Sequence, residues 1–291
     1  MKKMIKQIIK LIRIKQWIKN TFVLAPLLFS LNFVNFELCI KSGLTFLAFS
    51  FSASIIYIIN DILDRKKDAI HPIKKNRPIA NGTISIKQAL FIIFVLFIAD
   101  LVCLYKLPYK VLYTILLYIF MNILYSIKLK HIVLIDIFVI AIGFILRVYA
   151  GAYAISVPVS SYIFMTTLFI SLFLGFSKRK IELKHSGATT RQVLKNYSYN
   201  MLNQYIIISV ALTIMSYALY TLEASVINRF GTHRLIYSII FVIYGMFRYI
   251  YTLDKNKEVE DPTENVLTDK GLIVVCILYI VYILGIFIKL I

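Results

Sequence analysis

The chain has 291 residues, of which 60% are hydrophobic and 16% charged, and its mean hydropathy is +0.80. Soluble domains are about half apolar, whereas a membrane-spanning helix needs about 20 predominantly apolar residues. The composition therefore excludes a soluble enzyme, a disordered chain, a collagen and a disulfide scaffold. It predicts an all-α, polytopic membrane protein.

The charge balance is strongly basic, with 33 Lys and Arg against 14 Asp and Glu, a formal net charge of +19. In a soluble chain this excess would suggest a nucleic-acid partner, but basic connections also orient membrane proteins. Most basic residues lie in the N-terminus and in alternate connections; the others hold Lys41, Lys106, Lys110, Arg229 and Arg234. We expect a multi-pass protein of the cytoplasmic membrane with its N-terminus inside and no nucleic-acid partner.

Residues 1–20 form the first predicted element, an amphipathic helix on the cytoplasmic surface, because apolar residues recur there at helical spacing between Lys and Arg. Its role is anchoring or, for Lys15 and Lys19, contact with a substrate. Residues 21–291 are predicted to form one transmembrane domain with its C-terminus outside. Its nine expected spans are residues 21–40, 43–60, 88–106, 109–126, 132–155, 161–177, 204–222, 235–252 and 271–290.

The second predicted span runs into the first of three cytoplasmic loops, residues 61–87, through Asn60, Asp61, Asp64 and Asp68. On one helix, the last two aspartates lie within about 60° of Asp61. Like charges this close repel unless a cation neutralises them. Oxygen ligands beside substrate phosphates suit Mg²⁺, so the pattern predicts a metal–phosphate site. The alternative is a solvated helix end paired with the three basic residues 65–67.

Basic residues follow these acids closely, among them Lys74 and Arg77. Acids that hold a metal and cations that hold phosphate oxygens together favour a diphosphate site. His71, between the two groups, either orients the loop or takes part in the chemistry.

The other two predicted cytoplasmic loops, residues 127–131 and 178–203, are also basic. The first contains Lys128 and Lys130, and the second begins with Lys178, Arg179 and, three positions later, Glu182. Such loops suit phosphate groups on a substrate.

Arg147 lies inside the fifth predicted span, where a charge is costly and normally faces a partner or a cavity. It is either a structural hydrogen-bond hub or a substrate contact. Asp136 lies on the same face but about 16 Å away along the helix, so we expect each residue to have another partner. A transporter or channel would place more charge within the spans or repeat its topology, and the sequence shows neither.

Nine spans and an Asn-Asp-x-x-Asp-x-x-x-Asp motif resemble the UbiA-type membrane prenyltransferase superfamily. Within it, the chain resembles the polyprenyl-phosphate (decaprenyl-phosphate) phosphoribosyltransferase branch. The stretches that carry this resemblance are residues 13–20, 60–68, 71–74, 77–78, 125–130, 136, 146–147 and 178–183. Aromatic prenyltransferases of the superfamily carry a second Asp-rich motif where this chain has Lys128 and Lys130, which favours an acceptor bearing phosphate.

The resemblance implies Mg²⁺-dependent transfer, with Mn²⁺ as a possible substitute. A 5-phosphoribosyl group would pass from 5-phosphoribosyl diphosphate (PRPP) to a polyprenyl phosphate, with release of diphosphate and inversion at C1. Products of such enzymes feed cell-envelope glycans. The alternative on the same fold is an intramembrane prenyltransferase that moves a prenyl group from a prenyl diphosphate to an aromatic or other small acceptor.

The resemblance also assigns roles to residues. The expected metal ligands are Asn60, Asp61, Asp64 and Asp68. The expected catalytic residues are Asp61, Asp64, Asp68 and Lys130. The expected substrate-binding residues are Lys15, Lys19, Asn60, Lys74, Arg77, Tyr125, Lys128, Arg147, Lys178, Arg179 and Glu182.

Overall fold

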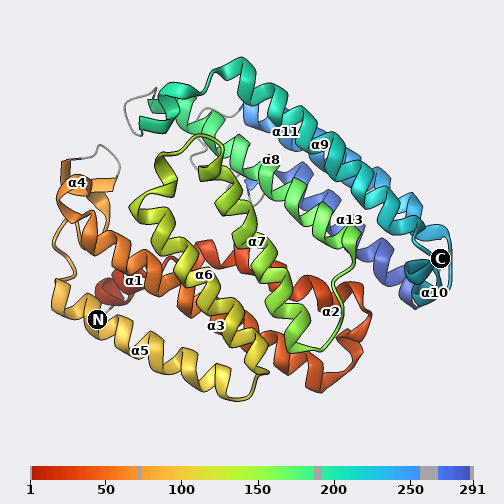
Figure 1. Ribbon diagram of the computed structural model, residues 1–291, viewed down its shortest axis with the longest axis horizontal. Helices are drawn as coiled ribbons and strands as arrows, with labels where there is room; N and C mark the ends of the chain where they lie inside the picture. The colour runs from red at the N-terminus through yellow and green to blue at the C-terminus, as the bar shows by residue number, and fades with distance from the viewer. Residues whose placement is uncertain (1, 71–73, 187–191, 256–267, 289–291) are drawn as a thin grey trace. The chain divides into compact units, whose positions relative to one another are not determined.

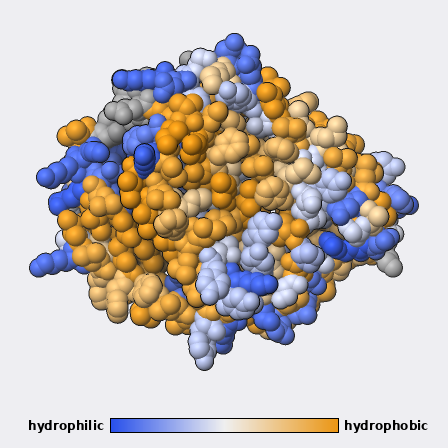
Figure 2. Space-filling view, viewed as in Figure 1, coloured by the Kyte–Doolittle hydropathy of each residue, from blue (hydrophilic) through white to orange (hydrophobic). Residues whose placement is uncertain are grey.

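The computed structural model describes the chain apart from residues 1, 71–73, 187–191, 256–267 and 289–291, and every regular element it describes is a helix (Figure 1). Eight helices in these residues are long and apolar enough to cross a membrane. They are Phe36–Leu63, Ile86–Tyr105, Tyr109–Ile127, Ile135–Ala154, Ser161–Lys184, Tyr199–Leu222, Arg234–Lys255 and Lys270–Phe287. Figure 2 shows hydrophobic side chains covering the visible face over α5 and α6, as expected for helices in contact with lipid.

The chain divides into two compact units. Unit 1 comprises residues 1–127 and 146–158, and unit 2 comprises residues 128–145 and 159–291. The helices of unit 1 are α1 (Lys2–Leu11), η1 (Ile14–Leu24), α2 (Ala25–Phe29), η2 (Asn32–Val34), α3 (Phe36–Leu63), α4 (Arg65–Ile70), η3 (Lys74–Asn76), α5 (Ile86–Tyr105) and α6 (Tyr109–Ile127). Those of unit 2 are η4 (Leu129–His131), α8 (Ser161–Ser186), η6 (Gln192–Asn196), α9 (Tyr199–Leu222), α10 (Ala224–Phe230), η7 (Arg234–Ser238), α11 (Ile239–Lys255) and α13 (Lys270–Phe287). Helix α7 (Ile135–Ala154) contributes its first half to unit 2 and its second half to unit 1.

The predicted first span, residues 21–40, is wrong as an α-helix. The 3₁₀ helix η1 occupies residues 14–24, a short α2 follows, and α3 then runs unbroken for 28 residues through the expected boundary near residue 42. Polar groups of η1 are satisfied by α3 instead: the Trp17 indole donates to Ser54 Oγ at 3.1 Å and Asn20 donates to Ser50 Oγ at 2.9 Å. Sequence hydropathy does not distinguish this arrangement from a regular span.

These contacts also set the direction of η1. Trp17 pairs with Ser54 and Asn20 with Ser50, so η1 runs antiparallel to α3, with α1 and α2 toward opposite ends of that helix (Figure 1). Eleven 3₁₀ residues extend about 22 Å and the five of α2 add about 7 Å. Together they match the hydrocarbon thickness of about 30 Å. The N-terminal segment is therefore long enough to make one pass beside α3 without forming a regular span.

A close backbone approach fixes η1 against α7. A Cβ atom on Gly151 would overlap the carbonyl oxygen of Val23. Val23 itself is fully buried, in a cluster with residues of α3, α6 and α7. Glycine at position 151 therefore permits the contact on which this part of unit 1 is built.

The N-terminal helix is shorter than predicted. Helix α1 ends at Leu11, and the chain turns at Arg13, whose φ of 54° is left-handed. Leu11 is fully buried against α3 and α5, whereas Met4 and Ile5 on the other face are 46% and 50% exposed. Helix α1 thus keeps the predicted amphipathic character, but the residues after it pack along α3 and do not continue the surface helix.

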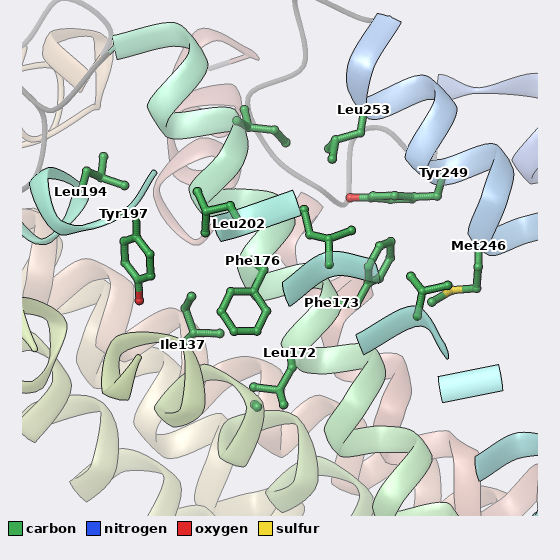
Figure 3. Close-up of a cluster of buried hydrophobic side chains, with 14 of the residues drawn as sticks. Ile137, Leu172, Phe173, Phe176, Leu194, Tyr197, Leu202, Met246, Tyr249 and Leu253 are labelled. Carbon is green, nitrogen blue, oxygen red and sulfur yellow. The ribbon is translucent and has the colours of Figure 1, made fainter. Parts of the chain in front are cut away.

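The core of unit 2 is a cluster of buried apolar side chains. Figure 3 shows Phe173 and Phe176 of α8 among residues of α7, α9 and α11. The rings of Phe173 and Tyr249 meet edge to face with their centroids 4.9 Å apart. This packing also holds Tyr197, which lies between η6 and α9 with its hydroxyl directed toward α7.

Candidate active site

Two carboxylates and two guanidinium groups meet at the end of α3 in unit 1. Arg77 Nη1 donates to Asp61 Oδ1 at 2.9 Å and to Asp68 Oδ2 at 2.6 Å. Arg13 Nη2 donates to the same Asp61 oxygen at 2.6 Å. The side chains of Asp61 and Asp68 are only 2% and 5% exposed, whereas those of Arg13 and Arg77 are 25% and 27% exposed. We call this group the arginine–aspartate cluster.

Local structure explains how the cluster forms. Helix α3 ends at Leu63, yet the Asp64 N–H still bonds to the Asn60 carbonyl at 2.9 Å and the Asp68 N–H to the Asp64 carbonyl at 2.8 Å. The chain therefore keeps a helical path, and two residues seven positions apart return to the same face. Arg77 follows η3 in the same loop, immediately before the buried Pro78 and Ile79, which pin that end of the loop.

The third predicted acid lies apart from the other two. Asp64 is the capping residue between α3 and α4, half-buried, and its carboxylate contacts no arginine of the cluster. In the part of the chain that the structure describes, no three acidic, histidine or cysteine side chains are close enough to hold a metal ion. The roles of Asn60 and Asp64 as metal ligands stay predictions.

The chemistry of the pair Asp61 and Asp68 nevertheless fits a divalent cation. One oxygen of each carboxylate already contacts a single cationic nitrogen, Arg77 Nη1. Carboxylate oxygens are hard ligands, and Mg²⁺ is commonly held by one or two carboxylates with substrate phosphates completing its coordination. Asp61 and Asp68 are therefore the residues that would hold a metal ion here.

Arg13 is a residue that sequence reasoning missed as a site residue. Its guanidinium stacks over the Tyr57 ring at 4.7 Å in addition to binding Asp61. In the sequence, Arg13 is one of many basic residues in the N-terminal segment. Spacing alone does not separate an arginine that reaches α3 from one that faces solvent.

The remaining unit 1 candidates are Lys15 and Lys19 of η1, Lys74 of η3 and Tyr125 of α6. Lys15 is exposed on η1, while Lys19, Lys74 and Tyr125 are half-buried and each has interactions of its own. His71 lies outside the described residues. Their predicted roles in substrate binding stay predictions.

Arg147 has the partners expected of a buried arginine in a span. Its Nε donates to Asn20 Oδ1 at 2.7 Å, and Nη2 donates to the Tyr118 hydroxyl at 3.1 Å. The guanidinium also lies over the rings of Phe49 and Tyr118, 4.9 and 4.8 Å from their centroids. Only 5% of the residue is exposed. This geometry connects η1, α3, α6 and α7, so Arg147 organises unit 1, and its contact with substrate stays a prediction.

A second polar network occupies unit 2. Tyr197 donates to Asp136 Oδ1 at 2.9 Å, and Arg179 Nε donates to Asp136 Oδ2 at 2.7 Å. Arg179 Nη1 also donates to Glu182 at 2.7 Å, and the Tyr197 hydroxyl accepts the Leu134 N–H at 2.7 Å. Burial raises the pKa of Tyr197 above its usual value, so the hydroxyl keeps the proton that it donates to Asp136.

This network determines how two predicted substrate ligands are held. Arg179 is fully buried and Asp136 is its partner, as expected from the separation of Asp136 and Arg147. Arg179 and Glu182 therefore support the start of α7 as the structure stands. Their direct contact with a substrate stays a prediction.

The lysines of the basic loops are more accessible. Lys128 is exposed before η4 and Lys130 is half-buried within it, and neither side chain bonds to another described residue. Lys178 on α8 is half-buried and engaged with neighbouring residues. Tyr197 and Leu134 hold the backbone three residues after η4, so the network supports the loop that bears Lys130.

Comparison with known proteins identifies the family of the chain. A profile of the UbiA prenyltransferase family matches residues 23–265. The chain belongs to the UbiA prenyltransferase family. This confirms the predicted superfamily, the all-α multi-pass membrane architecture and the prediction of a transferase enzyme.

Several curated relatives of this UbiA family member are named decaprenyl-phosphate phosphoribosyltransferase. The decaprenyl-phosphate phosphoribosyltransferase of Corynebacterium glutamicum is 31% identical over 292 residues, covering 96% of this chain and 88% of the relative. The protein of that name from Mycolicibacterium smegmatis is 32% identical over 226 residues, covering 75% of this chain and 71% of the relative. The match to the phosphoribosyltransferase branch is thereby confirmed.

Solved structures share the fold. A UbiA homologue from Archaeoglobus fulgidus bound to GPP and Mg²⁺ superposes with a TM-score of 0.69 at 16% identity, covering 97% of this chain and 99% of that one. A structure described as digeranylgeranylglyceryl phosphate synthase gives a TM-score of 0.63 at 22% identity and covers 99% of both chains.

Proposed function

We propose that this UbiA family member transfers a 5-phosphoribosyl group from PRPP to a polyprenyl phosphate and releases diphosphate. The observation that carries the proposal is the arginine–aspartate cluster, because a metal diphosphate needs both carboxylates for the metal and cations for the phosphate oxygens. The names of the curated relatives support a phosphoribosyl donor and a polyprenyl phosphate acceptor.

The reaction breaks the bond between C1 of the ribose and the diphosphate oxygen and forms a bond from C1 to an oxygen of the lipid phosphate. The bonding electrons leave with the diphosphate. We expect attack on the face opposite the leaving group, and hence inversion at C1. A phosphate monoester is already anionic near neutral pH, so the acceptor needs no strong general base. Catalysis then depends on positioning and on charge stabilisation.

The chain's own residues supply these two effects. Arg13, Arg77 and Lys74 bind the diphosphate oxygens as negative charge builds up on the leaving group. Asp61 and Asp68, with Asp64 and Asn60 as further ligands, hold Mg²⁺, which when bound neutralises diphosphate charge. Mn²⁺ accepts the same oxygen ligands.

The lysines of the two basic loops are assigned to the other phosphates. Lys128, Lys130 and Lys178 bind the 5-phosphate of the donor or the phosphate of the lipid. The accessible side chains of Lys128 and Lys130 support this role. Lys130 is the residue to which we assign a catalytic contribution, by stabilising phosphate charge during transfer.

We place the enzyme in the cytoplasmic membrane with the cluster on the cytoplasmic side. The basic N-terminus and loop 61–87 support this orientation, because cytoplasmic connections carry an excess of Lys and Arg. PRPP is water-soluble and would enter from that side, while the isoprenoid chain of the acceptor stays in the bilayer.

A product assay tests the proposal. Detergent-purified protein is incubated with Mg²⁺, PRPP and a polyprenyl phosphate, and a parallel sample receives a prenyl diphosphate with an aromatic acid. Mass spectrometry is expected to detect a phosphoribosyl lipid in the first sample only. Product in the second sample alone would assign the chain to ordinary prenyl transfer.

A further inference from the structure

The arginine–aspartate cluster is electrically balanced. Asp61 and Asp68 carry two negative charges, and Arg13 and Arg77 carry two positive charges in direct contact with them. Arg77 is the central member, because its Nη1 atom contacts both carboxylates. Both acids are almost fully buried, so each depends on these partners for its stability as an anion.

Neither a metal ion nor a diphosphate can enter this cluster alone without loss. A divalent cation at Asp61 and Asp68 must displace Arg77, and it then adds positive charge beside two freed guanidinium groups. A diphosphate at Arg13 and Arg77 must remove them from the carboxylates. Two buried anions would then face a third, and uncompensated buried charge is strongly unfavourable.

Together, the two ligands satisfy every group. Asp61 and Asp68 would hold the metal, and the freed guanidinium groups of Arg13 and Arg77 would bind the phosphate oxygens, for which their forked geometry is suited. Because Arg13 and Arg77 are about a quarter exposed, they have room to turn toward a ligand while the carboxylates stay in place.

We propose that Arg77, together with Arg13, exchanges Asp61 and Asp68 for the diphosphate of the donor when the metal ion binds, so that the metal and the donor each strengthen binding of the other. The proposal rests on the proposed function and adds a control of its binding order. In the resting cluster Arg77 acts as a built-in competitor of the metal, and the carboxylates act as competitors of the diphosphate. Such coupling is reciprocal and typically amounts to about 5–150-fold in affinity.

The first test measures metal binding without donor. The full chain in detergent is titrated with Mn²⁺, and free Mn²⁺ is followed by electron paramagnetic resonance. Arg77→Gln is expected to bind Mn²⁺ alone about tenfold or more tightly than the unmodified chain, since the competitor has been removed. The matched control is Arg65→Gln, which removes the same charge from exposed α4 and is expected to change the affinity little.

The second test measures diphosphate binding without metal. Inorganic diphosphate is titrated calorimetrically in the presence of EDTA. Asp61→Asn is expected to bind it about tenfold more tightly than the unmodified chain, because Arg13 and Arg77 are released from a carboxylate. Asp64→Asn removes an equal charge nearby but frees no arginine, so its effect is expected to be much smaller.

The outcomes separate the exchange from simple electrostatics and from misfolding. Equal effects of Arg77→Gln and Arg65→Gln, or of Asp61→Asn and Asp64→Asn, would overturn the exchange. Unchanged affinities in both arms would also overturn it and leave Arg77 as a fixed structural clamp. The arms use different variants, so misfolding of one, checked by size exclusion, leaves the other decisive. The product assay tests the proposed function separately, since phosphoribosyl lipid formed with unchanged affinities would remove the exchange alone.

Discussion

Asp61 is the residue on which both arginines of the cluster converge, at 2.6 and 2.9 Å. Asp61→Asn is expected to lower kcat/KM by about 100-fold or more, because it removes a proposed ligand of the metal ion that would neutralise charge on the leaving diphosphate. The product assay with PRPP and polyprenyl phosphate measures this. Glu37→Gln is the matched control, since Glu37 is an exposed acid at the other end of the same helix. Normal turnover in Asp61→Asn would contradict the assignment of the site.

Tyr197 makes two hydrogen bonds with one hydroxyl, as donor to Asp136 and acceptor from the Leu134 N–H. Tyr197→Phe leaves both groups without this partner and is expected to destabilise the protein by about 1–3 kcal/mol. Thermal unfolding in detergent measures the change. Tyr205→Phe serves as control, since Tyr205 contacts Phe176 through its ring and its hydroxyl has no hydrogen bond to a described residue. Equal midpoints for the two variants would argue against the network.

At the scale of single residues, the sequence identifies site residues best where their type is rare, such as acidic residues at the end of an apolar span in a basic chain. The spacing of Asp61 and Asp68 predicted a shared face, and the structure brings them together on Arg77. Asp64 shows the limit of the argument, since this capping residue contacts neither arginine of the cluster, and the three acids do not form one group that could hold a metal. Arg13 and Tyr197 act through folded contacts far apart in sequence, which no local pattern encodes.

The pairing of η1 with α7 depends on one missing side chain. Gly151→Ala would make Cβ overlap the Val23 carbonyl oxygen, so the backbones must move apart, at a cost of about 1–3 kcal/mol. Gly43→Ala is the matched control in α3, because nothing lies within 4 Å of its added Cβ. There we expect a gain of about 0.5–1 kcal/mol. Apparent melting temperatures of the two variants in detergent are expected to move in opposite directions, and a shared direction would refute the close approach.

Elements are predicted from the sequence to different degrees. Apolar length predicted α5, α6, α7, α9 and α13 because those helices need only a run of hydrophobic residues. The N-terminal pass was predicted as an α-helix, but it is built from 3₁₀ turns whose polar side chains bond to Ser50 and Ser54. A hydropathy average includes these polar residues without regard to their partners, so it does not distinguish an α-helix from a run of 3₁₀ turns.

At the scale of the whole molecule, the number of passes determines where the two ends lie. Eight regular spans alone would place both ends on one side, whereas a further pass by η1 and α2, antiparallel to α3, would place them on opposite sides. A split green fluorescent protein tag at the N-terminus is expected to fluoresce with a cytosolic partner fragment, and the same tag after Ile288 is not. Alkaline phosphatase fused after Ile288 is expected to be active. Fluorescence at both ends would show that the N-terminal segment does not cross.

Arg13 meets two structural requirements at one position, a left-handed backbone turn and a side chain that binds Asp61. Its left-handed backbone, with φ of 54°, ends α1, and such a turn is met most easily by glycine or asparagine. Its side chain must be a guanidinium to reach both Asp61 and the face of Tyr57. A substitution chosen to relax the turn therefore removes the guanidinium that binds Asp61. Enzymes often keep local backbone strain of this kind at residues that their activity requires. Stability engineering should therefore leave Arg13 unchanged, because glycine or asparagine at this position would relax the backbone but is expected to lower activity.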